Sequence, residues 1–234
     1  MTEMQPAERD LLLMVLAVAA GSADAWSYFG VSHSFVANMT GNTVLIGVAL
    51  VKQNGDLVPP LISVASYAVG VIAGAVLTRR VKPEVLWSKA VSWTLLAESA
   101  LIAASAISWA MLSSANAGSR IEHHELLGCL ALAIGMQSGA MLRMRIPGVV
   151  TTYITGTWTN LMSGLARMMT REAPESKSGK KKFEERLLLQ GGVLASYLLS
   201  AMVAGWLLGH LPEAAGALTV SAVFFAAIYG LVRS

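Results

Sequence analysis

Residues 36–42 of this chain read Val-Ala-Asn-Met-Thr-Gly-Asn, and residues 151–157 read Thr-Thr-Tyr-Ile-Thr-Gly-Thr. Each copy follows a long apolar segment and places a Thr-Gly pair among small polar residues, just before another apolar run. A polar interruption that recurs in corresponding positions of two hydrophobic halves is typical of duplicated membrane transporters. The two copies therefore predict a duplicated fold and mark the place of its functional site.

The composition around these copies is that of a polytopic membrane protein. Charged residues make up 13% of the 234-residue chain, whereas soluble domains carry about 25%. A run of about 20 apolar residues is long enough to cross a bilayer as a helix. Six such runs occur, at about 11–29, 60–78, 90–111, 125–143, 187–209 and 213–232. We expect an all-α polytopic membrane protein with a single integral membrane domain, in which repeat A covers about 11–111 and repeat B about 125–232.

Two weaker apolar stretches, 33–52 and 147–168, contain the Thr-Gly copies. If all eight segments cross, 11 basic residues lie inside and 6 outside; if the two weak segments are re-entrant, the division is 15 against 2. Because basic residues concentrate on the cytoplasmic side, the second division favours six transmembrane helices plus two re-entrant or broken segments, with both termini cytoplasmic. Three crossings per half would make the halves inverted-topology repeats. The alternative is eight crossings with parallel repeats.

The repeat extends beyond the two motifs. Residues 21–25 align loosely with residues 135–139, and the pair Ser66-Tyr67 matches Ser196-Tyr197. The longest hydrophilic stretch, 171–186, has no counterpart in the first half. We interpret it as a solvated cytoplasmic basic loop, and the alternative is a contact for anionic lipid headgroups.

These residues resemble a known family. The string Gly-Ser-Ala-Asp-Ala-Trp-Ser-Tyr-Phe at 21–29, together with residues 35–42 and 151–157, is similar to the YoaK-like integral membrane proteins (DUF1275, UPF0700), a bacterial family. The resemblance covers nearly the whole chain. It implies six transmembrane segments and hence a bacterial inner-membrane location, and it brings no established substrate or activity.

The two breaks are the candidate binding site. Glycine weakens a helix, and Thr and Asn side chains can satisfy the freed backbone groups. Inside a bilayer such backbone must be buried in protein or line a wet cavity. The runs after the two glycines could form half-helices whose N-terminal ends attract polar or anionic groups. The expected substrate-binding residues are Asn38, Thr40, Gly41, Asn42, Thr43, Thr151, Thr152, Thr155, Gly156, Thr157 and Asn160, with Gln137. Close helix packing by small residues is the structural alternative.

Two carboxylates lie inside predicted spans. An intramembrane acid costs at least about 2.5 kcal/mol on insertion scales, so it usually faces the protein interior and has a role. Asp24 in the first span could couple transport to an ion or proton, or could serve as a structural acceptor for the first break. Glu98 is a second coupling candidate. Gln137 falls near the place equivalent to Asp24 in the second half.

The sequence offers no convincing nucleophile–base pair, phosphate loop, dinucleotide fingerprint or metal-ligand spacing. We therefore expect no enzyme, no cofactor and no metal. Membrane topology accounts for the basic excess, so no nucleic-acid partner is expected. The leading hypothesis is a small-molecule or ion transporter or channel-like permease, whose partners are membrane lipids and a small polar solute or ion. A non-transporting membrane scaffold or assembly protein is the alternative, and a homo-oligomer is compatible with either.

Overall fold

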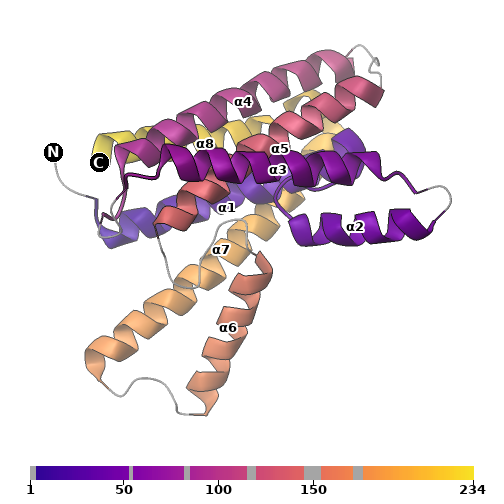
Figure 1. Ribbon diagram of the computed structural model, residues 1–234. Coiled ribbons are helices and arrows are strands. Elements are labelled where there is room, and N and C mark those ends of the chain that lie inside the picture. The colour runs from indigo at the N-terminus through magenta and orange to yellow at the C-terminus, as the bar shows by residue number, and fades with distance from the viewer. Residues whose placement is uncertain (1–3, 53–54, 82–84, 115–119, 145–153, 171–175) are drawn as a thin grey trace.

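A computed structural model describes residues 4–52, 55–81, 85–114, 120–144, 154–170 and 176–234. Its α-helices are α1 (Pro6–Trp26), α2 (Met39–Val51), α3 (Val58–Leu77), α4 (Lys89–Ser114), α5 (Arg120–Arg143), α6 (Ile154–Met169), α7 (Lys177–His210) and α8 (Ala217–Arg233). A π-helical turn, η1 (Ser27–Ser32), extends α1. The described residues contain no β-strand, which confirms the all-α prediction (Figure 1).

Six of the helices are long and apolar enough to cross a membrane, as the sequence predicts. The remaining two, α2 and α6, contain the Thr-Gly pairs in their first turns. Helix α2 has 13 residues and α6 has 16, which at 1.5 Å per residue gives lengths of about 20 and 24 Å. The hydrocarbon core of a bilayer is about 30 Å thick. Neither short helix therefore spans a bilayer alone.

The segment between α1 and α3 begins and ends at the same end of the helix bundle. Val31, His33, Asp56 and His124 line a common cavity of about 210 Å³, so the end of η1 and the beginnings of α3 and α5 lie together. His33 adopts a left-handed conformation with φ of 50°, where the chain turns back. Helix α2 then lies against α3 (Figure 1). This is the arrangement of a re-entrant segment.

The directions of α4 and α8 bear on the number of crossings. The indole of Trp109 donates to the Pro212 carbonyl (2.7 Å), while Gly230 packs against Trp87 and Ser92. The beginning of one helix thus meets the end of the other, and the two run in opposite directions. A chain that crossed eight times would make them run in the same direction. The contact agrees with six crossings.

The two halves of the chain pack reciprocally. Helix α1 packs on α7, and α5, its counterpart in repeat B, packs on α3. Close approach depends on glycine at matching places: a Cβ at Gly21 would collide with the Tyr197 carbonyl, and one at Gly135 with the Tyr67 carbonyl. Helices α4 and α8 complete the bundle by packing on each other, on α5 and on α1.

The start of α1 and the end of α8 lie together at one end of the bundle (Figure 1). Arg233 forms an ion pair with Glu8 (2.8 Å), and the Tyr229 hydroxyl donates to the same carboxylate (2.7 Å). The bundle between the two ends is closed by large apolar side chains of α1, α4 and α5. The largest fully buried ones are Trp26, Leu12, Leu13, Leu16, Leu95, Ile102, Leu127, Leu130 and Ile134.

The basic stretch 171–186 differs from the expected loop. Residues 171–175 lie outside the described part, but from Lys177 onward the chain is helical and forms the first turns of α7. Ser176 caps the helix by accepting from the Gly179 amide (3.1 Å). Lys180 and Lys181 each face a glutamate four residues later, a spacing that supports a helix. The cap and these pairs explain why a hydrophilic sequence continues the apolar span as one helix.

Candidate functional site

Asp24 fixes the first break. It is buried, and its Oδ1 accepts from the amides of Val36 (2.8 Å) and Ala37 (2.7 Å), with Asn38 at 3.4 Å. Its Oδ2 accepts from the hydroxyl of Tyr197 on α7. Every partner donates, so an ionised carboxylate, which can only accept, satisfies all of them. Asp24 thus accepts hydrogen bonds from the backbone just before α2, although it lies about eight residues before the end of η1 in the sequence. This geometry is that of a structural acceptor for the first break.

The two asparagines of the first motif also hold its backbone. The Asn38 side chain caps α2 by accepting from the Gly41 amide (3.0 Å). Asn42 is fully buried; it accepts from the Phe35 amide (2.9 Å) and donates to the Phe35 carbonyl (2.7 Å) and to Ser63 on α3 (3.0 Å). These bonds satisfy backbone groups that no helix satisfies. They explain why an Asn lies on each side of the Thr-Gly pair.

The second motif begins α6. Thr155 and Gly156 lie in its first turn, Thr157 is buried, and the Thr159 hydroxyl donates to the Thr155 carbonyl (3.0 Å). The predicted site residues Thr151 and Thr152 lie outside the described residues. The second break is therefore described from Ile154 onward.

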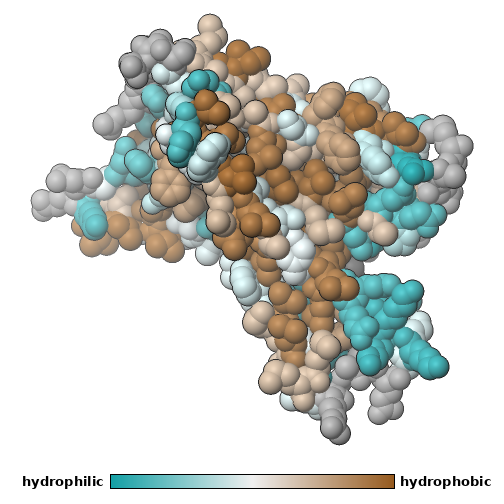
Figure 2. Space-filling model, turned by 180° about the vertical axis from the view of Figure 1, so that it is seen from behind, coloured by the Kyte–Doolittle hydropathy of each residue, from teal (hydrophilic) through white to brown (hydrophobic). Residues whose placement is uncertain are grey.

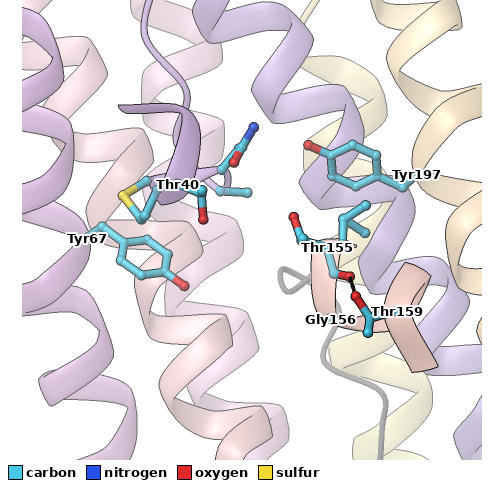
Figure 3. Close-up of a pocket in the computed structure, with 10 residues that line it drawn as sticks. Thr40, Tyr67, Thr155, Gly156, Thr159 and Tyr197 are labelled. Atoms are coloured by element: carbon cyan, nitrogen blue, oxygen red, sulfur yellow. Dashed lines mark hydrogen bonds between the residues drawn. The ribbon is translucent and has the colours of Figure 1, made fainter. Parts of the chain in front are cut away.

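Residues of both motifs line one cavity of about 410 Å³. Its walls come from the start of α2, the start of α6, and the middle of α3 and α7. Figure 3 shows Thr40 and Tyr67 on one side and Tyr197, Thr155 and Thr159 on the other. The full set is Ala37, Asn38, Met39, Thr40, Tyr67, Ile154, Thr155, Gly156, Thr159 and Tyr197. The structure thus brings the two Thr-Gly breaks together, 115 positions apart in the sequence at Thr40 and Thr155.

The two tyrosines are functional candidates that the site prediction missed. They are counterparts in the repeat, and each bonds across to the other half: Tyr197 to Asp24, and Tyr67 to the Ser138 hydroxyl (2.9 Å). Asp24 and Ser138 each lie three residues after the glycine on which the tyrosine packs. The repeated Ser-Tyr pair was the sequence signal for both.

These contacts also identify the counterpart of Asp24. We expected Gln137 near that place, but Ser138 occupies it. Gln137 is fully buried on another face of α5, where its side-chain amide donates to the Leu16 carbonyl (3.3 Å). The alignment of residues 21–25 with 135–139 itself pairs Asp24 with Ser138. Gln137 is one residue away, and a shift of one residue turns a helical side chain by about 100° onto another face.

Several predicted site residues do not line the cavity. Thr43 is exposed on α2 and donates to the Met39 carbonyl (2.9 Å). Asn160 lines a separate groove between α6 and α7. Asn42 and Thr157 are buried within the packing of their own segments, and Gly41 packs against Phe35. The cavity therefore uses part of each motif, while the rest maintains its shape.

Glu98 lies away from the cavity, in the middle of α4. It is fully buried, and neither carboxyl oxygen has a hydrogen-bond partner among the described residues. Along the antiparallel contact it lies between the levels of Ser92 and Trp109, and this part of α4 runs beside the middle of α8, whose buried residues include Ala222 and Ala226. A charge in such a place is costly. Glu98 is thus separate from the polar site.

Fold and site together define a class: a multi-pass α-helical membrane protein with two short helices whose beginnings meet at one cavity. Within this class, the chain belongs to the family described as protein of unknown function (DUF1275), whose model matches residues 12–231. It is 28% identical over 198 residues to the UPF0700 transmembrane protein YoaK of Bacillus subtilis (strain 168), covering 84% of this chain and 83% of that protein. No solved structure matches. The family predicted from residues 21–42 and 151–157 is confirmed.

Proposed function

We propose that this protein is a permease that moves a small polar solute through the cavity between its two Thr-Gly breaks. The observation that supports this most directly is that Thr40 and Thr155, equivalent residues of the two motifs, line the same cavity. Packing alone would bring small residues into close contact. Here the motifs instead border a space of about 410 Å³.

The lining indicates the kind of solute. Its polar groups are the hydroxyls of Tyr67, Tyr197, Thr40, Thr155 and Thr159 and the amide of Asn38; none of the lining residues carries a formal charge. Helices α2 and α6 begin at the cavity, and the backbone amides of their first turns carry partial positive charge. This combination suits a small neutral or anionic polar solute better than a cation.

The reciprocal packing suggests how the site could open to either side. Helix α2 packs on α3 and α3 on α5, whereas α6 packs on α7 and α7 on α1. The cavity lies between these two groups, because its walls come from α2 and α3 on one side and α6 and α7 on the other. Rocking of one group against the other would give alternating access, as in transporters with inverted repeats.

The remaining assignments belong to the same proposal. Arg9, Arg79, Arg80 and the basic start of α7 lie at one end of the bundle. By the positive-inside rule we assign this end, and with it both termini, to the cytoplasm of a bacterial inner membrane. Asp24 shapes the site and Glu98 stays a candidate for proton coupling. The chain acts without enzymatic chemistry, in contact with lipids and its solute.

The test is solute-induced swelling of proteoliposomes that contain the purified full chain. Glycerol and urea serve as neutral probes, and potassium formate serves as an anionic probe. We expect at least one probe to enter faster than it enters empty liposomes. Thr40→Val combined with Thr155→Val should slow that entry by about tenfold, because burying a polar solute against two unmatched methyl groups costs about 1.4 kcal/mol or more.

Thr43→Val is the matched control, since Thr43 lies three residues from Thr40 on the same helix but outside the cavity. It should leave the swelling rate unchanged. Entry that is equal in the double variant and the wild type would contradict the proposal, as would the absence of entry for all three probes. The second result would favour the membrane-scaffold alternative.

A further inference from the structure

A second groove lies between α6 and the first half of α7, away from the cavity. It has a volume of about 280 Å³, and its lining includes Arg167, Arg186, Asn160, Ser163 and Gln190. Arg167 lies over the Phe183 ring, 5.4 Å from its centre. The groove thus presents two guanidinium groups beside neutral hydrogen-bonding side chains. This is the chemistry that binds phosphate oxygens.

The groove lies at the level where α7 enters the hydrocarbon core. Arg186 is the last charged residue before an uncharged run of 187–209. The ten residues 177–186 carry five basic and two acidic side chains, and Lys180 and Lys181 face those two glutamates at 4.0 and 3.9 Å. The region around the groove therefore keeps a net positive charge.

The face of α6 that points away from the groove is apolar, because Trp158, Met162 and Leu165 lie about half a turn from Asn160, Ser163 and Arg167. Trp158, Met162 and Leu165 of α6 are 51%, 46% and 41% exposed. Figure 2 shows this contrast on the projecting α6–α7 hairpin, where a teal hydrophilic patch borders brown and tan hydrophobic surface. The groove itself contains the apolar side chain of Leu187 beside Arg186. Guanidinium groups in a groove of an otherwise apolar membrane protein suit a ligand with an anionic head and an apolar tail.

We propose that the α6–α7 groove binds the headgroup of an anionic phospholipid, whose acyl chains extend from the groove past Leu187 into the surrounding bilayer. Arg167 and Arg186 bind the phosphate, and Asn160, Ser163 and Gln190 contact the polar part of the head. The proposal does not depend on transport through the cavity. It gives α6, which packs mainly on α7, a lipid as its second partner.

The experiment measures lipid binding by the detergent-purified full chain, by native mass spectrometry and by thermal stabilisation. The probes are phosphatidylglycerol, phosphatidylcholine, glycerol phosphate and inorganic phosphate. We expect phosphatidylglycerol to bind at least about tenfold more tightly than phosphatidylcholine. The two soluble phosphates should neither stabilise the protein nor displace the lipid at equal concentration.

Arg167→Gln combined with Arg186→Gln should weaken phosphatidylglycerol binding by about tenfold or more. The matched control, Lys177→Gln with Lys181→Gln, removes the same charge outside the groove and should change binding by less than about twofold. The charge-preserving pair Arg167→Lys and Arg186→Lys should give an intermediate loss, because lysine lacks the bidentate fork.

Equal weakening by the arginine and lysine pairs would show that diffuse charge, and not the groove, attracts the lipid. Displacement by inorganic phosphate would show that the occupant is a soluble anion. Either result overturns the proposal, as does equal affinity for phosphatidylcholine. If the arginine pair fails to fold, Arg186→Gln alone must still weaken phosphatidylglycerol binding more than the lysine pair does.

Discussion

Tyr67 and Tyr197 make equivalent bonds to unequal acceptors. The Tyr197 hydroxyl donates to the carboxylate of Asp24, and the Tyr67 hydroxyl donates to the hydroxyl of Ser138. A hydrogen bond to a charged group contributes about 1.5–3 kcal/mol, and a neutral one about 0.5–1.5 kcal/mol. The first break is therefore held more strongly than the equivalent contact in the second half.

The substitutions Tyr197→Phe and Tyr67→Phe test this difference. We expect Tyr197→Phe to lower the free energy of unfolding by about 2 kcal/mol and Tyr67→Phe by about 1 kcal/mol. Denaturation of the purified protein in detergent gives both values. In an Asp24→Asn background the cost of Tyr197→Phe should shrink while that of Tyr67→Phe stays the same. Equal costs in all backgrounds would contradict a specific bond between Tyr197 and Asp24.

Two buried acids in this molecule are expected to respond in opposite ways to an apolar substitution. Asp24→Leu leaves the amides of Val36 and Ala37 and the hydroxyl of Tyr197 without an acceptor, and should cost about 3 kcal/mol or more. Glu98→Leu removes a buried carboxyl from an apolar site and should be neutral within about 1 kcal/mol, or stabilising. Thermal denaturation of the two variants measures the contrast. Strong destabilisation by Glu98→Leu would mean that its carboxyl has a partner in the membrane-embedded protein.

At the scale of helices, close packing of α1 on α7 depends on Gly21. A methyl group there would meet the Tyr197 carbonyl, which is backbone and cannot move aside. We expect Gly21→Ala to destabilise the protein by about 2 kcal/mol, as overpacking does. Gly205→Ala on α7 is the control: nothing lies within 4 Å of its added methyl group, so it should be neutral or stabilising by up to about 1 kcal/mol. Thermal midpoints in detergent compare the two, and equal midpoints would exclude the tight contact.

Most of these helices can be predicted from the sequence, because each is determined by residues within its own segment. Apolar runs predict the six long helices, and Gly41 and Gly156 predict where the two short ones begin. The exception is the start of α7. The hydrophilic composition around Lys180 predicts a loop, whereas the structure has a helix there. The Ser176 cap and ion pairs between residues four positions apart stabilise that helix. Those pairs are a helical signal that composition alone hides.

The cavity is less predictable, because it depends on packing between distant helices. Thr40 and Thr155 could be assigned from the repeated motif. Tyr67 and Tyr197 could be recognised as repeated residues, but their position at the cavity follows from how α3 and α7 pack on the opposite halves. Ser138, the counterpart of Asp24, follows from aligning residues 21–25 with 135–139, but its bond to Tyr67 follows from packing. The weak sequence repeat identifies which segments of the two halves correspond. Which of their side chains contact one another depends on how the helices pack.

At the scale of the whole molecule, charge and topology agree. Helix α3 runs from the end that holds Asp56 to the other end, so Arg79 and Arg80 lie at the end that holds the termini. The basic start of α7 is there too, because Lys182 and Arg186 share a cavity with Pro6 and Arg9. A chain with six crossings puts all these residues on one side, whereas eight crossings would put Arg79 and Arg80 on the opposite side.

Accessibility of single cysteines separates the two topologies. In a Cys129→Ser background, Asp56→Cys, Ser88→Cys and Ser234→Cys are labelled in intact spheroplasts with a membrane-impermeant maleimide. Six crossings with cytoplasmic termini require labelling at position 56 and protection at 88 and 234, until the membrane is permeabilised. Eight crossings require labelling at 88 and protection at 56 and 234. Position 234 fixes the orientation, because its labelling would mean that the termini are outside. Positions 56 and 234 lie on opposite sides if the first Thr-Gly break is re-entrant and on the same side if it crosses. Comparison of these two positions therefore decides between the schemes, with position 88 giving the opposite result to position 56.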